Sequence, residues 1–118
     1  MNLSSEFEEL KGIYNLKIYR FLINNREIFT NSQNSYLVMM AHRIYYMHKV
    51  LKDTGSFYLH CDSTMSHYLN PTMPHYLKII CDIIFGLKNF RNEIVWCYKN
   101  RGASIDRWSK NMICSFLY

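Results

Sequence analysis

Residues 50–62 read VLKDTGSFYLHCD, a run that passes from the end of a helix through a glycine turn into a short buried strand. Gly55 is the residue expected to adopt the left-handed conformation at this turn. The bulky run Ser56–His60 is predicted to form the strand, and a polar group follows it. Because ligands of open α/β sheets bind outside the carboxyl ends of the strands, His60 and Asp62 are predicted to border an active site.

A helix is predicted immediately before this strand, over Ser35–Leu51. Asn31–Asn34 forms a polar break that is suited to cap its start, and Lys49 and Lys52 lie where cations complement the helix dipole. A weaker helical periodicity covers Tyr14–Phe29. The stripe that predicts the main helix consists of residues three or four positions apart: Leu37, Met40, Ala41, Ile44, Met47, His48 and Leu51.

An eight-residue duplication follows the strand, since STMSHYLN at 63–70 is succeeded by PTMPHYLK at 71–78 with five of eight positions identical. A single duplication is too short for a repeat architecture. Because proline breaks a helix interior but is tolerated in the first turn, the helix is predicted to begin in the second copy, with Pro74 in its first turn. Gly86 is predicted to end this helix, and the first copy is predicted to be a loop.

Two further strands are predicted at Glu93–Lys99 and Met112–Tyr118, joined by a polar loop over Asn100–Lys110. The resulting order of helix, strand, helix, strand and strand indicates a piece of an α/β layered fold. A sheet of two or three strands with no closing elements would be poorly covered and would expose its edge.

The charge of the chain is concentrated near its end. Of a formal net charge of +5, residues 88–118 carry six Lys and Arg against two acidic residues, which is +4 and suits a polyanionic partner. Lys and Arg neutralise phosphates, and aromatic rings stack on bases. Five residues are therefore candidate nucleic-acid contacts: Tyr98, Lys99, Arg101, Arg107 and Lys110. The alternative is a solvated basic loop, with Trp96 and Trp108 packed in a core.

Several other classes are disfavoured by the sequence. The content of 49% hydrophobic and 16% aromatic residues argues against disorder, and 118 residues make at most one small domain. No uncharged apolar stretch approaches the ~20 residues of a membrane span, so no membrane partner is expected. The cysteines at 61, 81, 97 and 114 form no Cys-x-x-Cys pair, which favours free thiols in a reducing cytoplasm over disulfides or zinc. His60 and Cys61 are adjacent on a strand, so they face opposite sides and make a poor base and nucleophile pair.

The amino-acid sequence of two long segments strongly resembles that of site-specific DNA amino-methyltransferases of the adenine-N6 or cytosine-N4 type, as found in bacterial restriction–modification systems. The segments are Arg43–Asp62 (RIYYMHKVLKDTGSFYLHCD) and Asn89–Lys99 (NFRNEIVWCYK). The resemblance covers 35–99 best and includes the His-Tyr-Leu-Lys of the duplication. It implies a Rossmann-like sheet that binds S-adenosylmethionine and acts on a base flipped out of DNA. It also implies that Ser56–His60 is an inner strand beside the catalytic strand.

The family's two essential motifs do not occur in this chain. These are an Asp-Pro-Pro-Tyr-like tetrapeptide that holds the target amine and a Phe-x-Gly-x-Gly-like loop that binds the cofactor. The chain is therefore interpreted as a partial catalytic domain over 1–118, with a helical segment at 1–34, the best-matching core at 35–99 and a basic loop with a terminal strand at 100–118.

The function predicted from this resemblance is that of a fragment of an adenine-specific DNA methyltransferase that is inactive by itself and does not bind S-adenosylmethionine alone. Its cofactor-binding residues remain unassigned, and no catalytic or metal-ligating residue is assigned. The main alternative is a non-catalytic module that binds nucleic acid or complements a second chain carrying the missing motifs. A remnant that folds poorly is a further alternative.

Overall fold

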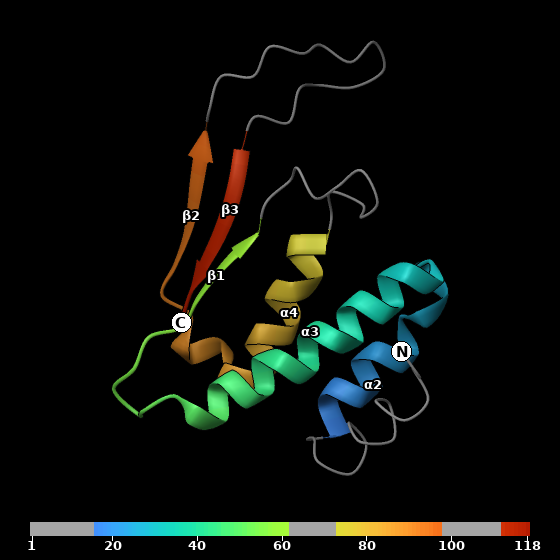
Figure 1. Cartoon of the computed structure of the whole chain (residues 1–118), viewed down its shortest axis with the longest axis horizontal. Helices are drawn as coiled ribbons and strands as arrows, with labels where there is room; N and C mark the ends of the chain where they lie inside the picture. Colours follow the sequence, from blue (N-terminus) through green and yellow to red (C-terminus); the bar gives the residue numbers. More distant parts are fainter. Residues whose placement is uncertain (1–15, 62–72, 98–111) are drawn as a thin grey trace.

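The computed structural model describes residues 16–61, 73–97 and 112–118, and these residues form helices packed on one side of a small sheet (Figure 1). The helical elements are α2 (Leu16–Asn24), η1 (Arg26–Ile28), α3 (Asn31–Val50), α4 (Met73–Phe85) and η3 (Leu87–Asn89), of which the η elements are short 3₁₀-helices. The strands are β1 (Tyr58–Cys61), β2 (Asn92–Cys97) and β3 (Met112–Leu117). The predicted order of helix, strand, helix, strand and strand is confirmed.

Helix α3 begins four residues before the predicted start at Ser35. The cap is Thr30, whose hydroxyl accepts a hydrogen bond from the Gln33 backbone N–H at 3.3 Å, while the Gln33 side-chain oxygen accepts one from the Thr30 N–H at 3.0 Å. This reciprocal pair is a capping box. The buried Asn34 amide donates to the Arg26 and Phe29 carbonyls, so the predicted polar break is the first turn of the helix.

The predicted apolar stripe of α3 is only partly correct. Leu37, Ala41 and Ile44 are completely buried, but Met47 is 47% exposed and His48 is also exposed. Beyond Ile44 the stripe is only partly covered, because Met47 is exposed whereas Leu51 packs against the core.

Helix α4 starts at Met73, which confirms that the helix begins in the second copy of the duplication with Pro74 in its first turn. The first copy lies outside the described residues. The predicted stop at Gly86 is confirmed, because this glycine has φ 86° and ψ 134°, a backbone conformation that residues with a Cβ rarely adopt. Gly55 has no positive φ, so the prediction of a left-handed Gly55 is wrong. A Cβ there would lie 2.7 Å from Leu51 Cδ1, and close packing explains this glycine instead.

Gly86→Ala is expected to lower the free energy of unfolding by about 1–3 kcal/mol, because alanine is strained in this region of φ and ψ. Urea unfolding followed by circular dichroism measures the change. Lys88→Ala, an exposed position in the adjoining 3₁₀-helix, serves as the control and is expected to change stability by less than about 0.5 kcal/mol. Equal effects of the two substitutions would rule out backbone strain as the cause.

The sheet has the strand order β1-β3-β2, and both pairings are antiparallel. β1 and β2 consequently run in the same direction with β3 between them. The strands predicted at Glu93–Lys99 and Met112–Tyr118 are confirmed as β2 and β3, although β2 begins one residue earlier and β3 ends one residue earlier than predicted. Tyr98 and Lys99 lie outside the described residues. Beyond β1, the pairing continues because Phe57 and Tyr118 exchange two backbone hydrogen bonds of 2.9 Å. In the described sheet, β1 is an edge strand.

The hydrophobic core lies between the helices and one face of this sheet. It combines Ile18 of α2, the apolar residues of α3, Leu77 and Ile80 of α4, and Phe116 of β3. The strands β2 and β3 extend past the helices (Figure 1), and every residue of β2 is exposed. The described part of the molecule is therefore a two-layer arrangement whose second sheet face has no described cover.

Candidate functional site

His60 lies on β1 and is exposed, whereas its neighbour Cys61 is 9% exposed and belongs to the core. The two side chains therefore face opposite sides of the sheet, as the alternation of a strand requires. His60 Nδ1 lies 3.0 Å from the hydroxyl oxygen of Ser115 on β3. Ser115 is buried and is paired with His60 across the two strands. Because the two residues are 55 positions apart in the chain, this contact was not predictable from the sequence. Asp62, the second predicted residue of this edge, lies outside the described residues.

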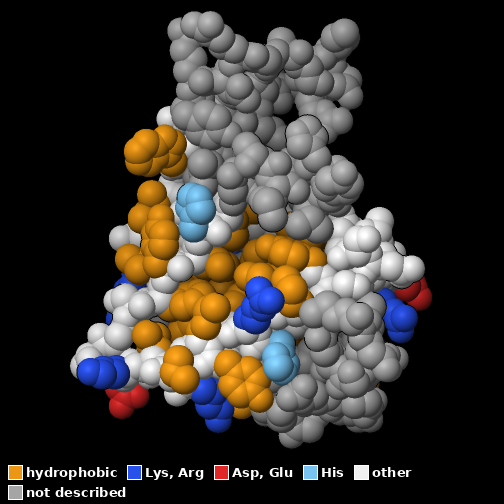
Figure 2. Space-filling view, viewed as in Figure 1, with side chains coloured by type: hydrophobic (Ala, Val, Ile, Leu, Met, Phe, Trp, Pro, Cys, Tyr) orange, Lys and Arg blue, Asp and Glu red, His pale blue; other side chains and the backbone are white. Residues whose placement is uncertain are grey.

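The strand register places His60 on the face of the sheet that points away from the helices. On this face lie Tyr58 at 53%, Ile94 at 44% and Trp96 at 68% exposure, with His60 and Ile94 both in register with Ser115. Figure 2 shows hydrophobic side chains and a histidine over the strands. We call these four residues, Tyr58, His60, Ile94 and Trp96, the open sheet face. The structure thus places Trp96 on the surface and not in the core.

The residues predicted to contact DNA, which are Tyr98, Lys99, Arg101, Arg107 and Lys110, lie outside the described part of the chain. The segment that carries them joins the end of β2 at Cys97 to the start of β3 at Met112. Its proposed role in DNA contact therefore stays a prediction.

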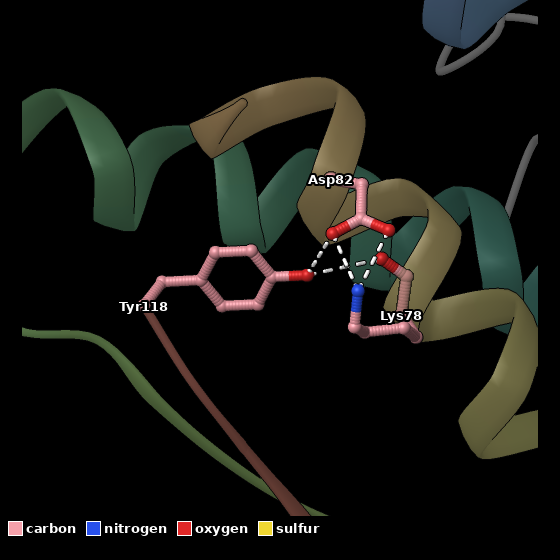
Figure 3. Close-up of polar contacts among 3 residues, drawn as sticks. All are labelled: Lys78, Asp82 and Tyr118. Atoms are coloured by element: carbon pink, nitrogen blue, oxygen red, sulfur yellow. Dashed lines mark hydrogen bonds and ion pairs between the residues drawn. The ribbon is translucent and has the colours of Figure 1, made fainter. Parts of the chain in front are cut away.

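A polar cluster on the helix side of the sheet was not foreseen from the sequence. Lys78 Nζ lies 2.6 and 2.8 Å from the two carboxylate oxygens of Asp82, and the Tyr118 hydroxyl donates to the same carboxylate (Figure 3). Lys78 Nζ also lies 3.9 Å from the centre of the Phe90 ring. The i to i+4 spacing of Lys78 and Asp82 is a signal that sequence reasoning could have used, but the contribution of Tyr118 depends on the tertiary fold.

This cluster is better suited to structure than to catalysis. Burial, followed by the hydrogen bond to Asp82 and the charge of that carboxylate, raises the pKa of the Tyr118 hydroxyl well above its usual range. The phenol therefore stays protonated at neutral pH and holds the end of β3 on α4. Burial also raises the pKa of the Cys81 thiol to about 12, so that this thiol is not a nucleophile at neutral pH.

A pocket of about 860 Å³ lies at the opposite end of β1 from His60. It is formed by the last turns of α3 and α4, the turn over 52–56 and the residues that precede β2. The charged residues in its described lining are Lys49, Lys52, Arg91 and Asp53, an arrangement that sequence reasoning did not predict.

No group of three or more His, Cys, Asp or Glu side chains in the described ranges is arranged to hold a metal ion. Within the same part of the chain, no helix combines the length and the apolar character needed to cross a membrane.

Residues 12–113 match the family model of the DNA methylases, N6_N4_Mtase. No individual curated protein matches the chain significantly. The family match includes the whole of α2, α3, α4, β1 and β2, and it ends within β3. Because residues 12–113 make up far more than half of the 118 residues, the chain belongs to the DNA methylase family.

Proposed function

We propose that this chain supplies part of the catalytic domain of an adenine-specific DNA methyltransferase of the restriction–modification type, acting in the bacterial cytoplasm. The observation that carries the proposal is the family match over residues 12–113. The reaction would move a methyl group from S-adenosylmethionine to the exocyclic amine of adenine in DNA. The base must leave the helical stack for this reaction, because its amine is otherwise out of reach of the enzyme.

The described residues do not fit a site for S-adenosylmethionine. Of the two glycines described, Gly55 packs on Leu51 and Gly86 ends a helix, so neither opens a cradle for a ligand. The Asp82 carboxylate is already occupied by Lys78 and Tyr118. The pocket beyond β1 carries three cations against one carboxylate, which disfavours a sulfonium cation. These observations support the proposal that the isolated chain does not bind the cofactor.

The contribution that we propose for this chain is a scaffold at one end of the catalytic sheet. Within the described residues β1 is paired on one side only, so its other edge can take a further strand. A second chain that carries the missing catalytic strand would pair there and cover the open sheet face. His60 and Asp62 would then border the methyl-transfer site, at the carboxyl end of β1.

A non-catalytic nucleic-acid-binding module is the second candidate function. It is favoured by the exposed aromatic rings of Tyr58 and Trp96, because rings on a sheet surface can stack on unpaired bases. The Lys and Arg residues of 99–110 would supply phosphate contacts in this case as well.

Methyl transfer from labelled S-adenosylmethionine to DNA tests the leading proposal. We expect no transfer above background by the purified chain, and transfer to adenine N6 when a second chain with the Asp-Pro-Pro-Tyr-like and Phe-x-Gly-x-Gly-like motifs, taken from the flanking reading frames, is added. Transfer by the chain alone would contradict the proposed inactivity, and label on cytosine would contradict the base specificity. Salt-dependent DNA binding without any transfer in the mixture would favour the second candidate function.

A further inference from the structure

We propose that the pocket at the amino end of β1 binds a phosphate group, and we call it the basic pocket. Its volume of about 860 Å³ is within the range of small-molecule sites. Because Gly55 and Ser56 line it while His60 lies at the other end of β1, it is separate from the predicted methyl-transfer edge. The inference does not rest on the methyltransferase proposal.

Within the described residues, no carboxylate forms an ion pair with a cation of the basic pocket. Lys49, Lys52 and Arg91 all line it, and Asp53 is the acidic residue among its lining. The ion pair found in the described part of the chain joins Lys78 to Asp82, so none of these three cations takes part in one. Among the described residues that line the cavity, the charge excess is therefore two positive units, and a concave arrangement of this kind concentrates anions.

The helix dipole accounts for only part of this charge. α3 ends at Val50, so Lys49 and Lys52 complement its exposed carbonyl groups, as lysines near a helix end commonly do. Arg91 has no such explanation, because it precedes β2 and its backbone N–H donates to the Leu117 carbonyl of β3 at 2.9 Å. The fold thus brings a cation from the sheet to a helix end that already carries two.

Two further polar residues of the basic pocket are also suited to bind phosphate. Thr54 and Ser56 are exposed and line the pocket, and both carry hydroxyl groups that can donate hydrogen bonds. Hydroxyl groups together with Lys and Arg form the usual donor set around phosphate oxygens in proteins. The Gly55 backbone N–H donates to the Lys52 carbonyl at 2.8 Å, and this tight turn places residues 52–55 together in the lining of the pocket.

Nuclear magnetic resonance titration of the full chain tests this inference with inorganic phosphate, adenosine 5′-monophosphate and adenosine. We expect the two phosphates, but not adenosine, to shift the backbone amide signals of Thr54, Gly55 and Ser56. The double variant Lys52→Gln/Arg91→Gln is expected to weaken binding about a hundredfold, because each lost charged contact costs about a factor of ten. The matched control is Arg20→Gln/Arg43→Gln, which removes the same charge from exposed helix positions outside the pocket.

The source of the phosphate is resolved by competition with a short DNA duplex. Displacement of the nucleotide by duplex DNA identifies the nucleic-acid backbone as the ligand. In that case the slope of the logarithm of the DNA affinity against the logarithm of the salt concentration should decrease by about one unit for each cation removed. Nucleotide binding that the duplex does not reverse identifies a free nucleotide. Unmoved signals at 54–56, equal binding of adenosine, or equal weakening by the control variant would overturn the inference. Circular dichroism of each variant verifies that it is folded, and none of these readouts depends on methyl transfer.

Discussion

Ile80→Ala is expected to lower the free energy of unfolding by about 3–4 kcal/mol, the largest effect that we expect from a single substitution in this chain. Ile80 lies on α4 and is completely buried in the core that α3, α4 and the sheet form together. Truncation to alanine removes apolar contacts and leaves a cavity, because the surrounding helices can relax only partly. Urea unfolding followed by far-ultraviolet circular dichroism measures the loss.

The neighbouring Ile79 provides a matched control for this prediction. It has the same side chain on the same helix but is 40% exposed, so Ile79→Ala is expected to cost less than about 1 kcal/mol. A domain of this length has an unfolding free energy of about 6–18 kcal/mol, so the loss at Ile80 would be readily visible. If both variants were equally destabilised, the packing of α4 described above would be wrong.

Alkaline pH is expected to unfold this protein through groups that are held protonated in the core. Burial raises the pKa of Cys81 from 9.0 to about 12, and burial also raises those of Tyr36 and Tyr118 from 10.0. In each case the folded state holds the proton more tightly than the unfolded chain does. The stabilisation is therefore complete below pH 9 and decreases as the pH rises above it. The unfolding free energy should decrease by about 1.4 kcal/mol per pH unit for each such group.

Two variants distinguish the contributions to this alkaline decrease. Cys81→Ala removes the thiol, so the decrease that begins near pH 9 should disappear and leave the part that begins near pH 10. Tyr118→Phe cannot ionise and should flatten the curve above pH 10, although it loses the hydrogen bond to Asp82 at every pH. Tyr58→Phe is the control, because it makes the same substitution at an exposed position of β1 and should leave the alkaline decrease unchanged. An unchanged slope in both core variants would contradict this account.

The elements of this fold were largely predictable from local patterns. The start of α4 followed from the restriction that Pro71 and Pro74 place on a helix, and its end followed from Gly86. The early start of α3 was missed because Thr30 and Gln33 form a capping box, a local signal that was present in the sequence. The exposure of Met47 was also missed, since the periodicity of a helix does not show where its neighbours end.

The candidate sites divide in a similar way. The separation of His60 from Cys61 onto opposite faces is a property of any strand and was correctly predicted. The contact of His60 with Ser115, the attachment of Tyr118 to Asp82 and the meeting of Lys52 with Arg91 at one pocket were not predictable. Each joins residues that are more than 35 positions apart in the chain.

The sequence by itself determined the family, the order of helices and strands, and the two ends of α4. These features depend on neighbouring residues, or on long segments that are similar to the family. Only the tertiary structure decided the strand order β1-β3-β2, the exposure of Trp96 and the gathering of Lys49, Lys52 and Arg91 around one cavity. Strand pairing and burial are set by which distant segments come together to remove apolar surface from water, and local spacing along the chain does not encode that choice.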